Sequence, residues 1–67
     1  MIRNTVFELR NAKRLTQEEL AQALGVTRQT VISLERNKYV PSLEMGFKVA
    51  RFFDKKIEDV FSYEAAE

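Results

Sequence analysis

The stretch that decides the fold is TQEELAQALGVTRQTVISLER, residues 16–36. Thr16 with Glu19 three residues later is the capping-box pattern that starts a helix. Gly25 supplies the left-handed residue that commonly ends one. Thr27 is a second good N-cap, so a new helix begins almost at once. The stretch therefore predicts two short helices joined by a tight turn.

Small and apolar residues stand where two such helices must cross. Ala21 allows the second helix to approach closely, and Gly25 makes the turn. The other positions face the core, and they are Leu20, Leu24, Val26, Val31 and Leu34. Because many positions satisfy the pattern at once, it is more specific than a lone glycine-rich motif. It predicts a helix-turn-helix over residues 17–36.

The stretch TQEELAQALGVTRQTVISLERNKYVPSLE resembles the Cro/C1-type (XRE-like) helix-turn-helix transcriptional regulators, particularly their short stand-alone members. The resemblance extends from Ile2 through IEDVF at 57–61. It implies an all-α, five-helix, lambda-repressor-like domain that binds a palindromic or near-palindromic operator as a homodimer. Members often have Gly where Asn37 stands and Ala where Gly46 stands. The second departure predicts a fourth helix weaker by about 0.5–1 kcal/mol, unless close packing requires the glycine.

The rest of the chain reads as one domain, residues 1–67, with three further helices. The first covers residues 5–13, the fourth begins after Ser42, and the fifth covers residues 57–61. Asn37 is a second predicted left-handed stop, and the segment before Pro41 is extended. The predicted apolar stripe of the fourth helix is Leu43, Phe47, Ala50 and Phe53 or Phe52. A small strand pairing of the two chain ends is also expected, involving Ile2, Val6, Phe61 and Tyr63.

Composition excludes several classes of protein. The chain has neither Cys nor His, so we expect no disulfide, no metal site, no cofactor and no enzyme active site. No apolar run approaches a membrane span and no signal peptide opens the chain, which indicates a cytoplasmic protein. Residues 1–38 hold seven basic and four acidic side chains, and residues 39–67 hold four and six. This asymmetry is typical of a basic binding end, although it is weak evidence alone.

The outward face of residues 28–36 is the predicted reading surface, because the second helix of the motif enters the major groove. Arg28 suits guanine O6 and N7, and Gln29 suits adenine N6 and N7. Ile32 either meets a thymine methyl or is an ordinary exposed apolar residue. The expected base contacts are Thr27, Arg28, Gln29, Ile32 and Ser33.

Phosphate contacts form a second predicted layer. Gln17 stands at a helix N-terminus, where backbone N–H groups attract anions. Similar regulators use the loop after the recognition helix to hold the backbone. The expected contacts are Arg14, Gln17, Thr30, Arg36, Asn37, Lys38 and Tyr39. Surface solubility is the alternative for each, and Thr30 also suits a thymine methyl.

Two opposite charges fall on inward faces. Glu35 shares its face with Val31 and Leu34, and Arg10 shares the inner stripe of the first helix. We expect a partly buried Arg10–Glu35 salt bridge, a pairing also seen in this family, that orients the recognition helix. The alternative is that both side chains reach out to water.

Apolar residues late in the chain predict a dimer surface over residues 57–65 and the connector before the fourth helix. The expected interface residues are Val40, Ile57, Phe61 and Tyr63, of which Ile57 and Phe61 also suit the monomer core. The sequence thus favours a homodimeric regulator of double-stranded DNA that acts as a repressor, with no small-molecule effector evident. The alternative is an antitoxin or a helix-turn-helix that binds protein.

Overall fold

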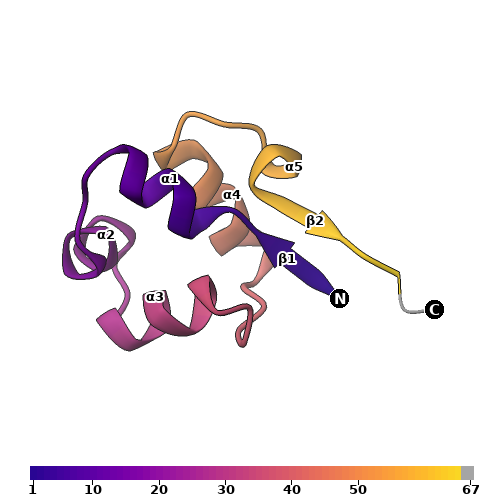
Figure 1. Cartoon of the computed structure of the whole chain (residues 1–67), viewed down its shortest axis with the longest axis horizontal. Coiled ribbons are helices and arrows are strands. Elements are labelled where there is room, and N and C mark those ends of the chain that lie inside the picture. Colours follow the sequence, from indigo (N-terminus) through magenta and orange to yellow (C-terminus); the bar gives the residue numbers. More distant parts are fainter. Residues whose placement is uncertain (66–67) are drawn as a thin grey trace.

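The computed structural model describes residues 1–65. In chain order its elements are β1 (Ile2–Asn4), α1 (Val6–Ala12), α2 (Gln17–Leu24), α3 (Arg28–Glu35), α4 (Leu43–Phe52), α5 (Ile57–Val60) and β2 (Phe61–Tyr63). Within these residues, five helices enclose one core and the two strands pair at one end (Figure 1). The predicted five-helix fold with a small terminal sheet is confirmed. None of the helices described is long and apolar enough to span a membrane.

Side-chain caps start three of the helices as predicted. At α2 the capping box is complete, since Thr16 Oγ1 accepts from Glu19 N at 3.0 Å and Glu19 Oε1 accepts from Thr16 N at 2.8 Å. Thr27 caps α3 and Ser42 caps α4 by accepting from the backbone N–H three residues on. These caps satisfy N–H groups that have no partner inside the helix, which is why these helices begin where the sequence predicts.

Left-handed residues follow four of the helices. The predicted stops Gly25 and Asn37 have φ of 73° and 59°, and Arg14 and Asp54 adopt 58° and 57° at the ends of α1 and α4. After each, the chain donates back into the last turn, as Leu15 N does to Arg10 O at 3.1 Å. This is the Schellman closure. Arg14 and Asp54 were not predicted, because neither residue type signals a left-handed conformation as Gly or Asn does.

The core lies where α1 to α5 converge. Its buried apolar residues are Val6, Leu20, Ala21, Leu24, Val31, Leu34, Val49, Ala50, Phe53 and Val60. Four of the helix-turn-helix residues predicted to face the core are buried there: Leu20, Leu24, Val31 and Leu34. The fifth, Val26, is partly buried and packs against the cluster. The core therefore fixes the crossing of α2 and α3.

The predicted apolar stripe of α4 is wrong at two positions. Leu43 is 72% exposed and Phe47 is 47% exposed. The buried stripe is instead Gly46, Val49 and Ala50, followed by Phe53. It begins at a glycine, so hydrophobicity alone does not reveal it. A Cβ at Gly46 would lie 3.2 Å from Ile57 Cδ1, which supplies the packing reason for a glycine at this place.

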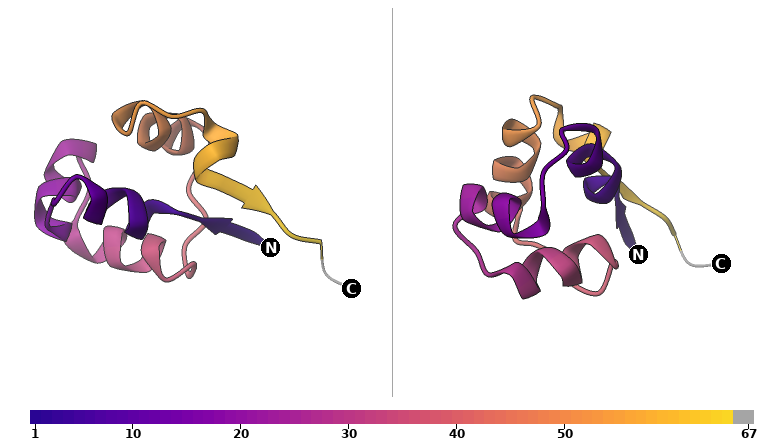
Figure 2. Two further views of the ribbon diagram at one scale, coloured as in Figure 1. Left: turned by 45° about the horizontal axis from the view of Figure 1, so that its top comes forward. Right: turned by 60° about the vertical axis from the view of Figure 1, so that its left-hand side comes forward.

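The terminal strands form a two-stranded antiparallel sheet. Ile2 pairs with Tyr63, Arg3 with Ser62 and Asn4 with Phe61. Two predicted bounds shift as a result: Val6 belongs to α1 rather than to a strand, and α5 ends at Val60 because Phe61 begins β2. In both views of Figure 2 the strands extend together from the helices, close to the C-terminal end of α3.

Candidate DNA-binding face

Helices α2 and α3 are joined by the turn at Gly25, and α3 lies along one edge of the molecule with its outer side turned away from the other helices (Figure 1). Val31 and Leu34 on its inner side are buried in the core. The opposite, outer side therefore faces away from the core.

The outer side of α3 carries the residues predicted to contact bases. Arg28 and Gln29 are exposed in its first turn, and Arg36 is exposed just beyond its last residue. Ile32 and Ser33, one turn further along, are half-buried. The helix thus presents hydrogen-bonding side chains near its N-terminal end, where recognition helices contact base edges.

A hollow runs along the flank of α3 that faces α1 and the start of α2. One part is lined by Arg10, Thr16, Gln17, Glu18 and Arg28, and the adjoining part by Phe7, Gln17, Arg28, Ile32, Glu35 and Arg36. We call this the α2 flank. The predicted phosphate contacts Gln17 and Arg36 lie in it, whereas Arg14 does not and instead occupies the α1–α2 turn.

A second hollow borders the opposite flank of α3 and is called the loop flank. Its lining residues are Thr27, Gln29, Thr30, Ser33, Lys38 and Tyr39. The hydroxyls of Thr27 and Thr30 lie 2.9 Å apart and share a hydrogen bond. Lys38 and Tyr39 come from the loop after α3, so this flank brings together both ends of α3.

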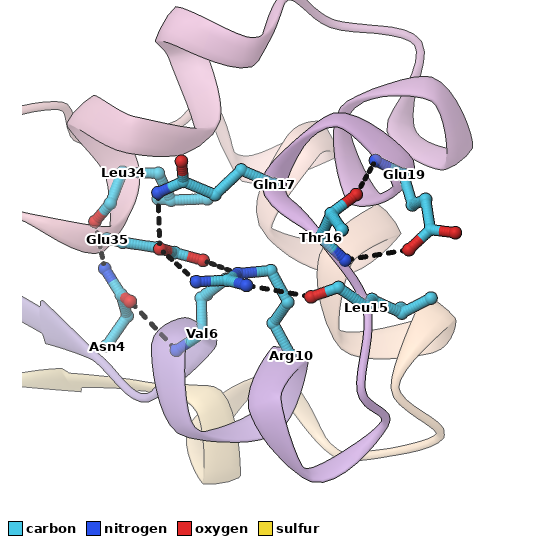
Figure 3. Close-up of polar contacts among 9 residues, drawn as sticks. All are labelled: Asn4, Val6, Arg10, Leu15, Thr16, Gln17, Glu19, Leu34 and Glu35. Carbon is cyan, nitrogen blue, oxygen red and sulfur yellow. Dashed lines mark hydrogen bonds and ion pairs between the residues drawn. The ribbon is translucent and has the colours of Figure 1, made fainter.

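Beneath α3 lies a buried polar network (Figure 3). Arg10 Nε donates to Glu35 Oε2 at 2.6 Å and Arg10 Nη2 to Glu35 Oε1 at 3.1 Å. The two side chains are only 10% and 5% exposed. The salt bridge expected from the sequence is thus present, its geometry is bidentate, and both groups are held away from water rather than reaching out to it.

Neighbours complete the network. Gln17 Nε2 donates to Glu35 Oε1 at 3.2 Å, and Arg10 Nη1 donates to Leu15 O at 2.8 Å. The Phe7 ring lies against the Arg10 guanidinium, with its centroid 5.5 Å from Arg10 Cζ. None of these three contacts was predicted, because each joins residues whose side-chain types alone do not specify a partner. Gln17 is thereby held between the buried pair and the surface hollow.

Comparison with known proteins gives the family. A family model described as helix-turn-helix matches residues 6–60. An uncharacterized HTH-type transcriptional regulator of Methanocaldococcus jannaschii is 52% identical over 66 residues, covering 98% of this chain and 100% of that protein. The chain belongs to the XRE family of helix-turn-helix regulators.

Two further similarities agree. A second uncharacterized HTH-type transcriptional regulator, from Archaeoglobus fulgidus, is 46% identical over 66 residues, covering 98% of this chain and 93% of that protein. The solved structure of the restriction-modification controller protein C.AhdI from Aeromonas hydrophila matches with a TM-score of 0.72 and 37% identity, covering 81% of this chain and 78% of that one. The protein is accordingly a transcriptional regulator with a helix-turn-helix DNA-binding fold, and not an enzyme.

The regulator also has an apolar face beside the terminal sheet. A shallow hollow there is lined by Ile2, Val40, Pro41, Ser42, Leu43, Gly46, Ile57 and Phe61. Phe47 lies one helical turn after Leu43, and Tyr63 pairs with Ile2 across the sheet. We call this set, Phe47 and Tyr63 included, the apolar face.

All four predicted interface residues lie on the apolar face. Val40 and Tyr63 are well exposed, and Ile57 and Phe61 are half-buried against the core. The sequence did not identify Leu43 and Phe47, since both were assigned to the core. Their exposure is the signal that reveals them, because large apolar side chains gathered on a surface mark contact sites.

Proposed function

We propose that this regulator is a homodimeric repressor that binds a palindromic or near-palindromic operator with α3 in the major groove. The observation that carries the proposal is the exposed pair Arg28 and Gln29 on the outer side of α3, between two surface hollows. The more general function, transcriptional regulation through a helix-turn-helix fold, is shared with the relatives.

Base recognition would come from the first two turns of α3. The Arg28 guanidinium has a planar fork of donors that matches guanine O6 and N7, and the Gln29 amide matches adenine N6 and N7. Thr27 and Ser33 add hydroxyls that donate or accept. Ile32 is half-buried beside Phe7, so its remaining surface is suited to a thymine methyl.

The two flanks suit the two phosphate backbones that border a major groove. In the α2 flank, Thr16 N and Glu19 N are already paired by the capping box, which leaves the first helical N–H groups of α2 for an anion. Gln17 and Arg36 supply side-chain donors beside them. In the loop flank, Thr30, Lys38 and Tyr39 take the same role. Asn37, which precedes Lys38, and Arg14 in the α1–α2 turn would be outer contacts.

The second copy would pack on the apolar face. A C2 dimer uses the same surface twice, so it needs a patch that is apolar and self-complementary. The apolar face supplies the apolar patch, and its residues Val40 to Leu43 follow the C-terminal end of α3 along the chain. Two recognition helices arranged around it would sit about 34 Å apart, one turn of DNA.

Repression follows from occupancy. A small dimer that covers about one to two turns of DNA prevents polymerase from using the same site. We also infer that the regulator acts in the cytoplasm, where the archaeal and bacterial relatives keep their DNA.

Selection of bound sequences from a random DNA pool tests the proposal. We expect an inverted repeat whose half-sites are about 10 base pairs apart, and affinity that falls steeply with salt, with a log–log slope of about −0.9 per neutralised phosphate. Reporter expression from a promoter carrying the selected site should fall when the regulator is present. Recovery of no sequence, together with a salt-independent protein partner, would favour the antitoxin or protein-interaction alternative.

A further inference from the structure

Asn4 ties strand β1 to the C-terminal end of the recognition helix. Its Nδ2 donates to Leu34 O at 2.8 Å and to Asn37 Oδ1 at 3.2 Å, and its backbone N also donates to Asn37 Oδ1 at 3.2 Å. Its Oδ1 accepts from Val6 N at 3.0 Å. Figure 3 shows the side chain between Leu34 and Val6. We call the bonds from Asn4 to Leu34 and Asn37 the Asn4 clamp.

Backbone partners fix which way the Asn4 amide faces. Leu34 O can only accept and Val6 N can only donate, so exchanging the amide O and N would lose both bonds. Leu34 O belongs to the last turn of α3, whose carbonyls have no partner further along the helix. The same Leu34 O also accepts from Asn37 N at 3.1 Å. The clamp therefore uses the second acceptor site of a helix-terminal carbonyl and holds the end of α3 to the sheet.

The same strand leads to the apolar face. Asn4 pairs with Phe61 across the sheet, and Thr5 N donates to Val60 O at 2.9 Å. Phe61 belongs to the apolar face and packs close to Gly46 of α4. The terminal sheet is thus part of the surface proposed to hold the second copy, and Asn4 connects it directly to the helix proposed to read DNA.

We propose that Asn4 is a positioning residue that fixes the direction of α3 relative to the second copy, and so sets the half-site spacing that the dimer accepts. This rests on the dimeric DNA binding proposed above. One added base pair moves a half-site by about 3.4 Å and turns it by about a tenth of a turn. A dimer with rigidly held recognition helices rejects that change, whereas a dimer with loosened helices tolerates it.

The test measures Kd for duplexes that carry the selected half-site twice, at the best spacing and at spacings one base pair shorter and longer. Wild type is compared with Asn4→Ala and with the matched control Arg3→Ala. Arg3 is the neighbour of Asn4 in β1, and its Nε pairs with Glu64 Oε1 at 2.9 Å within the terminal region rather than with α3. Circular dichroism at the assay temperature establishes that each variant is folded.

We expect wild type and Arg3→Ala to prefer the best spacing by about tenfold or more, and Asn4→Ala by about threefold or less. Affinity of Asn4→Ala for a single half-site should stay within about threefold of wild type. Asn4→Asp keeps the acceptor for Val6 N and loses both side-chain donors, so it replaces Asn4→Ala if that variant does not fold.

Three results would overturn the inference. An equal loss of affinity at every spacing would make Asn4 a general stabiliser, and an unchanged spacing profile would remove any positioning role. If wild type binds DNA without a spacing preference, the dimeric mode proposed above fails as well. The first two results leave the wild-type spacing preference intact, so they reject the clamp alone.

Discussion

Two arginine–carboxylate pairs in this small regulator differ in almost everything except chemistry. Arg10 Nε meets Glu35 Oε2 at 2.6 Å with side chains 10% and 5% exposed, and Arg3 Nε meets Glu64 Oε1 at 2.9 Å with side chains 52% and 55% exposed. The first joins α1 to α3, and the second joins the N-terminal and C-terminal parts of the chain.

The surroundings of each ion pair decide what it contributes to the protein. Water and salt screen the exposed pair, so it contributes little to stability. In the buried pair, desolvation offsets much of the attraction between the charges. Both side chains nevertheless make further hydrogen bonds, since Arg10 also donates to Leu15 O and Glu35 also accepts from Gln17. The buried pair therefore connects α1, α3 and Gln17 to one another, and its proposed role is to orient α3.

The largest expected effect is from Glu35→Ala. Removing this carboxylate leaves the Arg10 guanidinium buried without its counter-charge, and the free energy of unfolding should fall by about 3–5 kcal/mol. Urea denaturation followed by circular dichroism measures it. A loss below about 1 kcal/mol would show that the buried pair behaves like the exposed one.

The double variant Arg10→Met, Glu35→Leu separates stability from orientation. Apolar replacements remove both desolvation costs, so the double variant should be more stable than either single variant. Its affinity for operator DNA should nevertheless stay below wild type, because Gln17 has lost its acceptor. Full DNA affinity in the double variant would contradict an orienting role.

Arg28→Ala tests an exposed charge that is proposed to act only when DNA is present. Affinity should fall by about 1–3 kcal/mol and preference at one base pair per half-site should relax, with unfolding unchanged within about 0.5 kcal/mol. Lys38→Ala is the matched control, since it should weaken all sequences alike and reduce the salt slope by about 1. Competition assays with single-base operator variants give the comparison, and an unaltered preference would remove Arg28 from the reading surface.

A smaller effect of opposite sign is expected from Glu18→Gln. Glu18 lines the α2 flank, so its carboxylate repels a phosphate held there by Gln17. Affinity for DNA should rise by about 0.5–1 kcal/mol at low salt, while the fold loses a few tenths of a kcal/mol because the acid also favours the start of α2. Titrations at two salt concentrations measure the gain, and a loss of affinity would place the phosphate elsewhere.

The smallest effect belongs to Arg3→Ala. Breaking the exposed pair should change the free energy of unfolding by about 0–0.5 kcal/mol, and less still in 1 M salt, where the Debye length is about 3 Å. Urea denaturation at low and high salt is the measurement. A loss approaching that of Glu35→Ala would end the contrast between the two pairs.

Local signals made much of the fold predictable. The caps at Thr16, Thr27 and Ser42 and the stops at Gly25 and Asn37 each depend on a few neighbouring residues, and the structure confirms them. Features that depend on packing between helices were not predicted. Leu43 and Phe47 of α4 were assigned to the core because a stripe that begins at a glycine carries no hydrophobic signal at that position.

Long-range polar partners divide in the same way. Arg10 and Glu35 were paired from sequence because each is a charge on an inward, apolar face. Two opposite charges in such places are most simply explained as partners. Asn4 and Leu34 were not connected, since an asparagine in a strand and a helix-terminal carbonyl 30 residues away share no pattern. A side chain that bonds to backbone has no complementary residue type to identify its partner.

Methylation interference on the selected operator tests the central claim most directly, because it reports which groove the regulator occupies. Guanine N7 lies in the major groove and adenine N3 in the minor groove. We predict that methylation at N7 of guanines within two half-sites, centred about one helical turn apart, abolishes binding, and that adenine N3 methylation there does not. Interference confined to adenine N3, or to one unrepeated site, would contradict a dimer that reads bases with α3.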